Sequence, residues 1–383
     1  MFRSFWMGGF EGACHVNRLN TRLDLLAATQ HDVLAASDYH LMNGAGLGTV
    51  RDGVRWPLID RGASYDFSSF LPMLRAAVDE HEQVIWTLCH YGWPDDLDVF
   101  SPAWVDRFAR YCSAVARVVA DNTDEVPFYS PINEISFLSW AAGDAGGFIH
   151  PHARGRGNEL KRQLVRAAIA GIDAVWQVDP RARIVHVDPV IKVFPRRDQP
   201  ELAEEARRYD ESQFEAWDML VGAREPNLGG AAKYLDIMGL NFYHSNQWEH
   251  GGGRLRWEDE PRDDRWVPLH QLIEGLYRRY QRPICMGETS HFGSGRARWI
   301  REIGDEIAAA IRNGIPIEGV CLYPVIDRPD WEDANHWHNS GLFDFTHDPD
   351  GTLRRVLNAE YAGALREAQA TVAEALSDAL VCD

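Results

Sequence analysis

Two glutamates, Glu134 and Glu288, each stand at the downstream end of a short apolar segment. Glu134 ends Pro-Phe-Tyr-Ser-Pro-Ile-Asn-Glu at 127–134, and Glu288 ends Arg-Pro-Ile-Cys-Met-Gly-Glu at 282–288. A pair of carboxylates on opposite sides of a pocket can cleave a glycosidic bond, because one protonates the leaving oxygen while the other attacks the anomeric carbon or activates a water. Glycoside hydrolysis is therefore the first chemistry that this chain suggests.

The elements that must position these carboxylates alternate between strands and helices. Short apolar segments bounded by turn residues are typical of strands buried on both faces, and amphipathic stretches with helical period lie between them. The predicted strands are 3–10, 48–56, 83–90, 126–132, 183–189, 235–241, 282–288 and 317–325, and the main predicted helices are 65–80, 102–121, 159–178, 201–221, 267–280, 296–313 and 358–380. This order predicts an α/β fold, a single (β/α)8 TIM barrel.

In such a barrel the catalytic groups gather at the C-terminal ends of the strands, where both glutamates would lie. Long loops at 135–158, 190–200, 242–266 and 327–350 follow strands and would cover the same face. We expect residues 1–383 to form one catalytic domain, since no linker, repeat or low-complexity segment interrupts the chain.

The composition limits the classes of partner that the protein can bind. The net charge of −18 argues against nucleic acid and anionic membranes, which select basic surfaces, and favours a soluble enzyme with a neutral small-molecule substrate. With no signal segment and no membrane-length apolar stretch, the sequence predicts a cytoplasmic location and leaves the oligomeric state open. We expect free buried thiols at the six scattered cysteines, which are Cys14, Cys89, Cys112, Cys285, Cys321 and Cys382.

Seven motifs along the chain resemble, in order, those of the family 1 glycosidases, which are retaining β-glucosidase-like enzymes of clan A. The chain is similar to a short and divergent member of that family. The motifs are Phe5-Trp6-Met7-Gly8, Arg51 with Trp56, His90-Tyr91-Gly92-Trp93-Pro94, Asn133-Glu134, Asn241-Phe242-Tyr243, the stretch 323–331 and Ser340-Gly341-Leu342-Phe343-Asp344. Together they span residues 3 to about 345.

The resemblance implies a role for each residue of the pair. Glu288 would be the nucleophile, with Arg51 and Tyr243 donating hydrogen bonds that keep its pKa low. Glu134 would be the acid/base residue, with its pKa raised by the charge of Glu288 and by burial against Trp140 or Phe137. The distance between the two carboxyl groups decides the stereochemical outcome of hydrolysis, since ~5 Å is typical of retention and ~6.5–9.5 Å of inversion. The sequence leaves those two alternatives open.

The resemblance also implies a shell of sugar contacts. Asn133 would hold the 2-hydroxyl, and Trp331 would stack on the sugar ring. We also expect substrate contacts from His15, His90, Asn241 and Asp330, and from Trp93 beside His90, whereas Trp248 and Trp337 are left open.

Three positions in this shell depart from the family pattern, one of them Tyr323, which stands where the family has a tryptophan. His15 stands where the family has a glutamine, and Asp330 stands where it has a glutamate. The changes at His15 and Asp330 predict that plain β-glucosides are poor substrates and that a 6-deoxy, pentose or otherwise modified sugar fits better.

No metal or cofactor is expected. The loop 327–350 is rich in Asp, Glu and His, but its spacing matches no zinc signature, so we interpret it as solvated or hydroxyl-binding. The charged run 258–264 is interpreted as a solvated, mobile segment. A catalytically silent sugar-binding barrel, or a module accompanying another carbohydrate enzyme, is the alternative function. Retention of Glu134, Glu288, Arg51 and Tyr243 together favours the active enzyme.

Overall fold

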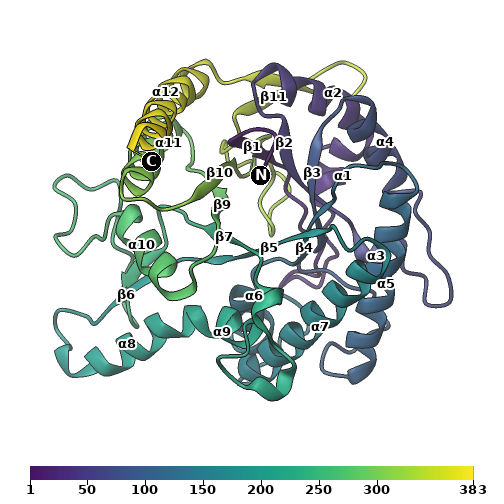
Figure 1. The fold of residues 1–383 in the computed structure, drawn as a ribbon, viewed down its shortest axis with the longest axis horizontal. Coiled ribbons are helices and arrows are strands. Elements are labelled where there is room, and N and C mark those ends of the chain that lie inside the picture. The colour runs from purple at the N-terminus through teal and green to yellow at the C-terminus, as the bar shows by residue number, and fades with distance from the viewer. Residues whose placement is uncertain (383) are drawn as a thin grey trace.

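The computed structural model describes the backbone of residues 1–382 and the side chains of residues 1–379. Eight parallel strands close a barrel in the order β1, β2, β3, β4, β5, β7, β9, β10, with helices around them (Figure 1). The strands are β1 (Trp6–Gly9), β2 (Thr49–Gly53), β3 (Gln83–Cys89), β4 (Phe128–Ile132), β5 (Arg183–Pro189), β7 (Ile237–Asn241), β9 (Ile284–Thr289) and β10 (Ile317–Leu322). The predicted (β/α)8 barrel and its eight strands are confirmed.

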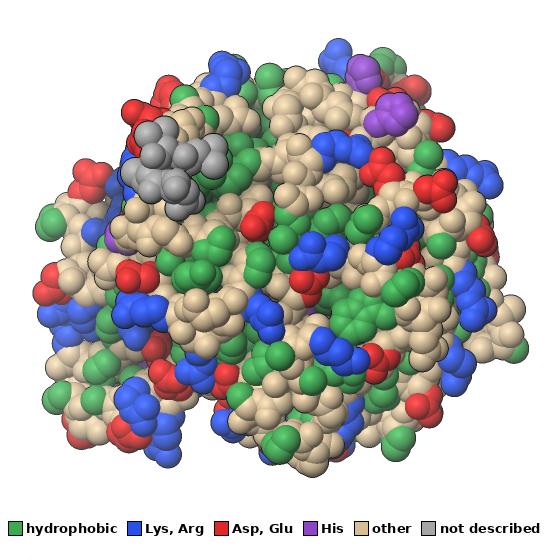
Figure 2. Space-filling model, viewed as in Figure 1, with side chains coloured by type: hydrophobic (Ala, Val, Ile, Leu, Met, Phe, Trp, Pro, Cys, Tyr) green, Lys and Arg blue, Asp and Glu red, His purple; other side chains and the backbone are tan. Residues whose placement is uncertain are grey.

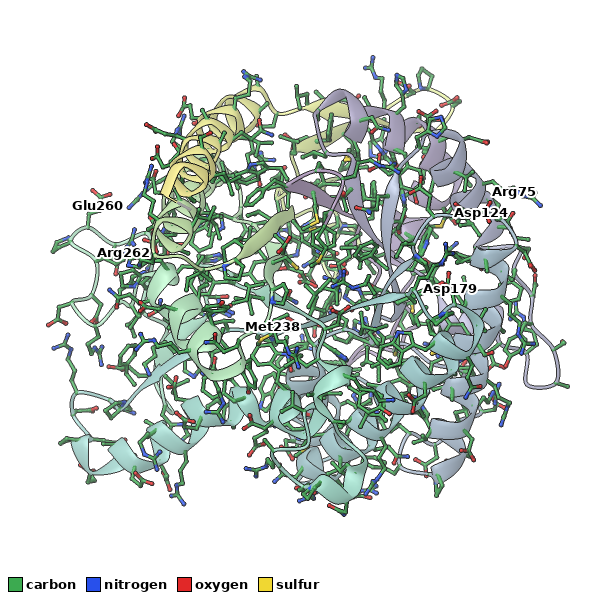
Figure 3. All side chains as sticks on the ribbon, viewed as in Figure 1. Arg75, Asp124, Asp179, Met238, Glu260 and Arg262 are labelled. Carbon is green, nitrogen blue, oxygen red and sulfur yellow. The ribbon has the colours of Figure 1, made fainter. Side chains whose placement is uncertain are left out.

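Side chains alternate between the two faces of each strand, and this alternation separates two buried layers. The barrel interior holds one cluster of buried side chains, and Figure 3 shows the middle of the molecule filled with side chains. This inner cluster consists of Met7, Ile85, Phe128, Val185, Val187, Ile237, Cys285, Cys321 and Tyr323. Residues of the opposite strand faces pack against the helices in a second, larger cluster. The strands are thus buried on both faces, which accounts for their nearly continuous apolar sequence.

The longer helices follow the barrel strands and lie outside them. They are α2 (His31–Gly44), α4 (Leu71–Asp79), α5 (Pro102–Ala120), α6 (Ile135–Gly143), α7 (Gly157–Val178), α8 (Ala203–Glu211), α10 (Leu269–Tyr280), α11 (Gly295–Arg312) and α12 (Ala359–Cys382). Shorter helical segments are α1 (Leu25–Ala28), α3 (Trp56–Ile59), α9 (Glu215–Leu220), η1 (Pro200–Leu202), η2 (Ser212–Phe214), η3 (Pro226–Leu228) and η4 (Ala232–Tyr234). Helices α11 and α12 lie side by side (Figure 1).

Helix prediction succeeded at some boundaries and failed at others. Asn358 caps α12 as expected, because its Oδ1 accepts a hydrogen bond of 3.0 Å from the backbone N–H of Tyr361. The continuous helix predicted over 201–221 is wrong, since the chain there forms η1, α8, η2 and α9 in succession. Helix α6 was also missed and lies within the segment 135–158 that we expected to be a loop.

Two small sheets order the loops above the barrel. Strands β6 (Lys192–Phe194) and β8 (Gln247–Glu249) pair in parallel, and β11 (Phe343–His347) pairs with β12 (Leu353–Leu357) in an antiparallel hairpin. Helix α8 packs on β6, where Asp210 accepts hydrogen bonds from Lys192 Nζ at 2.6 Å and from the Val193 N–H at 2.8 Å. These contacts attach the long loops to one another instead of leaving them free.

The surface mixes both charges, and the described thiols are unpaired. Acidic and basic side chains are interspersed over the face drawn in Figure 2. The five cysteines with described side chains are free and buried, namely Cys14, Cys89, Cys112, Cys285 and Cys321, while the side chain of Cys382 lies outside the described part. Among the helices that the structure describes, none combines the length and the apolar character needed to cross a membrane.

Candidate active site

Glu134 lies in the tight turn between β4 and α6. Its backbone is left-handed, with φ of 49°, a conformation that is uncommon for a residue with a side chain and that is often found at functional positions. The backbone N–H of Glu134 donates to the carbonyl of Val187 on β5 at 3.1 Å, which fixes the turn against the next strand. The carboxylate accepts hydrogen bonds from Asn241 Nδ2 at 2.8 Å and from the hydroxyl of Tyr91.

Glu288 lies near the end of β9 and is held by two strong donors. Nη1 of Arg51 donates to one carboxylate oxygen at 2.6 Å, and the hydroxyl of Tyr243 donates to the other at 2.6 Å. The Arg51 side chain is 2 % exposed, so this ion pair is almost completely shielded from water. Arg51 also donates to Asn133 Oδ1 and to Thr87 Oγ1, which holds the guanidinium in place.

Strand register brings the two glutamates into one network. Asn241 on β7 is the register partner of Glu288 on β9, and the amide of Asn241 contacts Glu134. This arrangement depends on Gly287, where an added Cβ would lie 2.7 Å from Asn241 Oδ1. Glu134, Glu288, Arg51, Asn241 and Tyr243, which the sequence places far apart, thus lie in one connected network.

Their charged neighbours make the two buried carboxyl groups chemically different. Burial, together with the negative charge of Glu288, raises the pKa of Glu134 to about 8, and the hydrogen bonds from Tyr91 and Asn241 only partly oppose this. Glu288, in contrast, forms an ion pair with a guanidinium. Among the described residues, no arginine, lysine or histidine forms an ion pair with Glu134. One carboxyl group is therefore protonated near neutral pH beside a carboxylate that a cation balances.

Several buried polar atoms next to this pair have no partner within the protein. His15 is 1 % exposed, and neither of its ring nitrogens is hydrogen-bonded. The indole N–H of Trp331 and Oδ1 of Asn241 are also buried and unpartnered. The ring of His15 lies 4.7 Å from that of Trp331, and both contact Tyr91, whose hydroxyl reaches Glu134. Because unpaired buried polar groups are costly, this wall suits a ligand rich in hydroxyl groups.

His90 is placed differently from His15, although both were predicted to contact substrate. One ring nitrogen of His90 lies 3.1 Å from Asn133 Nδ2, and the other lies 3.3 Å from the hydroxyl of Tyr323. Burial holds the pKa of His90 well below its usual range, so the ring is neutral. His90 and Asn133 therefore support each other and Arg51, and their contacts are already formed within the protein.

Sequence reasoning missed a third acidic group in the site, Glu11. It follows β1, is 6 % exposed, and lies 3.1 Å from Nε of Arg328 and 3.4 Å from the hydroxyl of Tyr323. Burial raises its pKa in spite of the neighbouring Arg328. Its position directly after the first strand, in Gly9-Phe10-Glu11-Gly12, was the available signal. Tyr91, which donates to Glu134, was also missed as a contact of the pair.

Asp330 and several tryptophans make contacts of their own outside this network. The carboxylate of Asp330 accepts from the backbone of Glu332 and Asp333 and lies 3.0 Å from His338 Nε2, so it holds its own loop together. Trp93 packs against Trp104 and His150. In the outer loops Trp337 packs on Phe345 and Trp248 on Tyr209. Of the two residues expected to cover Glu134, Trp140 is 39 % exposed, whereas Phe137 packs against Tyr91 and Trp331.

No protein-family model matches the sequence, and no curated protein matches it. Solved structures do match the fold. A family 1 β-glucosidase from Thermotoga maritima superposes with a TM-score of 0.74 at 13% identity, covering 97% of this chain and 98% of that one. The AHE enzyme from Alicyclobacillus herbarius gives 0.73 at 15% identity over 96% of this chain and 98% of that one. Virulence factor SghA from Agrobacterium tumefaciens gives 0.69 at 18% identity over 89% of this chain and 87% of that one.

These similarities cover nearly the whole chain at low identity. The protein therefore shares the fold of the family 1 β-glucosidases, as its motifs indicated. The Thermotoga maritima enzyme has been solved with glucoimidazole and with castanospermine bound. At this identity the similarity establishes the fold, and the chemistry must be argued from the residues themselves.

Proposed function

We propose that the protein is a glycoside hydrolase that cleaves β-linked glycosides of small soluble substrates with retention of configuration. One observation carries the proposal. Two buried glutamates belong to the same hydrogen-bond network, yet of the two only Glu288 is paired with a cation, Arg51. A retaining enzyme needs this asymmetry, because its nucleophile must be ionised while its acid must hold a proton. The bound inhibitors of the Thermotoga maritima enzyme are consistent with a small glycoside as substrate.

The two steps follow from these roles. In the first, Glu288 attacks the anomeric carbon while Glu134 gives its proton to the glycosidic oxygen, so the aglycone leaves as an alcohol and an ester joins the sugar to Glu288. In the second, the Glu134 carboxylate takes a proton from water, the water oxygen attacks the anomeric carbon, and the ester bond to Glu288 breaks. Both carboxyl groups return to their starting states. We expect the two groups to lie ~5 Å apart, as retention requires.

Other residues prepare the pair. Arg51 and Tyr243 orient the Glu288 carboxylate, and Asn133 is positioned by Arg51, His90 and Tyr91. In this proposal His15, Asn241 and Trp331 contact the sugar through their unpartnered polar atoms. Asp330 reaches the sugar only if its loop rearranges, since its carboxylate is engaged within 330–338. Residues 1–383 act as one cytoplasmic catalytic domain, and the two steps require no cofactor.

The decisive experiment uses a panel of nitrophenyl β-glycosides with different sugars. Wild type should hydrolyse at least one of them, whereas Glu288→Gly should lose several orders of magnitude in rate, because the nucleophile is absent. Azide should restore turnover of the variant and yield a glycosyl azide of inverted configuration.

Glu318→Gln is the matched control, since Glu318 lies on β10, the strand next to β9, and is 25 % exposed. It should retain wild-type rates. Wild-type protein that binds these sugars without turning any over would support the silent sugar-binding barrel instead.

A further inference from the structure

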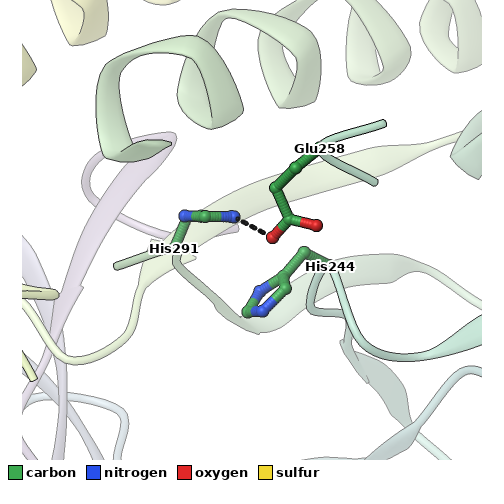
Figure 4. A group of neighbouring side chains, drawn as sticks. All are labelled: His244, Glu258 and His291. Carbon is green, nitrogen blue, oxygen red and sulfur yellow. Dashed lines mark hydrogen bonds and ion pairs between the residues drawn. The ribbon is translucent and has the colours of Figure 1, made fainter. Parts of the chain in front are cut away.

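Two histidines and a glutamate meet just outside the candidate active site. His244 follows Tyr243 after β7, His291 lies three residues beyond Glu288 after β9, and Glu258 belongs to the loop between β8 and α10. One potential ligand atom from each of the three lies within 4.8 Å of the others (Figure 4). Figure 4 shows the Glu258 carboxylate beside the ring of His291 and above that of His244, and Nε2 of His291 lies 3.1 Å from a Glu258 oxygen.

The ring nitrogens of both histidines are suited to metal binding. His244 Nδ1 is buried and has no hydrogen-bond partner. His291 Nδ1 lies 3.0 Å from the carbonyl of Phe292, so it can donate a proton there and leave Nε2 free to bind a cation. A backbone acceptor on the second ring nitrogen is a common support for a histidine that binds metal. Without a cation, Nδ1 of His291 instead accepts from the Phe292 N–H at 2.8 Å, and Nε2–H faces Glu258.

Aromatic packing fixes the rings, while the carboxylate retains some freedom. The ring of His291 lies 5.0 Å from that of Trp257, which is 1 % exposed, and the rings of His244 and His291 are 4.3 Å apart. Glu258, with a side chain 39 % exposed, can move to close the geometry. Tetrahedral Zn²⁺ binds nitrogen and oxygen ligands at ~2.0–2.2 Å, which requires only a modest approach of the three groups.

The loop that carries Glu258 is tied to α11 on its outer side. Glu260 pairs with Arg298 at 3.0 Å, and Arg262 pairs with Glu302 at 2.8 Å. Figure 3 shows Glu260 at one edge of the molecule, with Arg262 close to it. The charged run 258–264 is mostly exposed, as the sequence suggested, and Glu258 contacts His291 from its first position.

We propose that His244, Glu258 and His291 bind one divalent transition-metal ion, with Zn²⁺ as the best match. Two imidazoles and one carboxylate form a ligand set that Zn²⁺ accepts with a fourth position left for water, whereas Ca²⁺ and Mg²⁺ prefer oxygen ligands alone. The ion would join two segments to the loop of Glu258. One follows β7 and carries Tyr243, and the other follows β9, the strand that carries Glu288. The role of the ion is to hold this side of the pocket in place, separate from the two catalytic steps.

Calorimetric titration of metal-free full-length protein with Zn²⁺ tests the proposal, and Co²⁺ supplies an absorption signature of tetrahedral coordination. One equivalent should bind to wild type. Glu258→Gln should weaken binding roughly 10-fold or more, and the double variant His244→Gln/His291→Gln should abolish it. Zn²⁺ should also raise the midpoint of thermal unfolding of wild type, with a smaller rise in Glu258→Gln.

Glu260→Gln is the matched control, because Glu260 lies two residues from Glu258 in the same loop but pairs with Arg298. It should bind Zn²⁺ as wild type does. The proposal is overturned if wild type binds no stoichiometric Zn²⁺, or if Glu258→Gln and Glu260→Gln bind equally. It is also overturned if binding survives in the double histidine variant and is lost in His338→Gln, which would assign the ion to the 330–338 loop. These readouts are binding and stability, so they are independent of glycosidase activity.

Discussion

Arg51 and Asp52 are neighbours on β2, yet their side chains enter two different buried groups of charges. Arg51 points into the candidate active site, where it pairs with Glu288. Asp52 points toward α2 and belongs to a structural charge cluster of His31, Asp38, Tyr39, Asp52 and Arg355. Both groups are shielded from water. The first adjoins the unpartnered polar atoms of His15 and Trp331, whereas every side-chain nitrogen and oxygen of the five residues in the second has a partner or some exposure.

The structural charge cluster is closed on itself. His31 lies between Asp38 at 2.8 Å and Asp52 at 2.9 Å, the hydroxyl of Tyr39 donates to Asp52 at 2.6 Å, and Arg355 donates to both oxygens of Asp38. Every charge there has an opposite charge or a hydrogen-bond donor beside it. Satisfied networks of this kind fix a structure, whereas the unpartnered atoms of His15 and Trp331 suit binding. The comparison predicts that one group governs stability and the other governs activity.

The largest effect should follow from Glu134→Gln. The amide cannot protonate the leaving oxygen, so substrates with poor leaving groups should lose roughly 10²–10⁴-fold in rate, while activated nitrophenyl glycosides lose much less. Because the pKa of Glu134 is raised to about 8, wild-type activity should fall as pH rises through that value, and the variant should lack this fall. Rates measured across leaving groups and pH provide the check. Equal losses for all leaving groups would assign Glu134 a structural role.

The positions of Glu134 and Glu288 in the fold were partly predictable from the sequence. The alternation of apolar segments with amphipathic stretches was enough to predict the barrel, and the strand-end positions of Glu134 and Glu288 were enough to predict the face on which both residues lie. Glu11 escaped notice because its main partner, Arg328, is more than 300 residues away, and only folding brings the two within 3.1 Å. Asp330 could be recognised by its position in a motif, but not by its partners, which lie in its own loop.

Helix α2 shows why the structural charge cluster was also missed. Its buried residues are His31, Ala35, Asp38, Tyr39 and Met42. Their spacing is helical, but three of them are ionisable, so the helix presents no continuous apolar stripe. Pairing with Asp52 and Arg355, from β2 and β12, is what permits their burial. A sequence pattern cannot show such compensation between distant segments.

A second large effect should come from Asp38→Asn, this time on stability. The substitution removes the carboxylate that both His31 and Arg355 contact, and it leaves those buried cations short of a partner. Loss of one partner from a buried charge network typically costs ~3–5 kcal/mol. Urea unfolding should show this loss, while kcat/KM of the folded variant stays near wild type. A large fall in kcat/KM with unchanged stability would reverse the contrast between the two groups.

The same cluster should make stability depend on pH in a defined window. Burial lowers the pKa of His31, but the charge of Asp52 and the hydrogen bonds to Asp38 and Asp52 outweigh it and raise the pKa from 6.5 to about 9. Protonation of His31 is therefore stabilising at pH below 6.5, and this contribution is lost as pH rises to about 9. Each proton bound on folding changes the free energy of unfolding by at most about 1.4 kcal/mol per pH unit.

The measurement is the free energy of unfolding of wild type and His31→Gln at intervals from pH 6 to pH 10. The difference between the two proteins isolates His31, because other titrating groups are common to both. The difference should shrink as pH rises through the window. A constant difference would mean that the pKa of His31 is the same in the folded and the unfolded protein.

The smallest effect, and the sharpest test of the comparison, concerns the two buried histidines His15 and His90. His15→Phe replaces a buried ring with two unpartnered nitrogens by an apolar ring, so the free energy of unfolding should stay unchanged or rise. His90→Phe should lower it, because Asn133 Nδ2 and the hydroxyl of Tyr323 each lose one of their partners. If His15 contacts the sugar, kcat/KM of His15→Phe should fall by a factor corresponding to ~1–3 kcal/mol, and His15→Gln should shift preference toward β-glucosides. Parallel stability and kinetic measurements on both variants give the answer. A His15→Phe protein as destabilised as His90→Phe and still fully active would show that the unpartnered wall is not where the substrate binds.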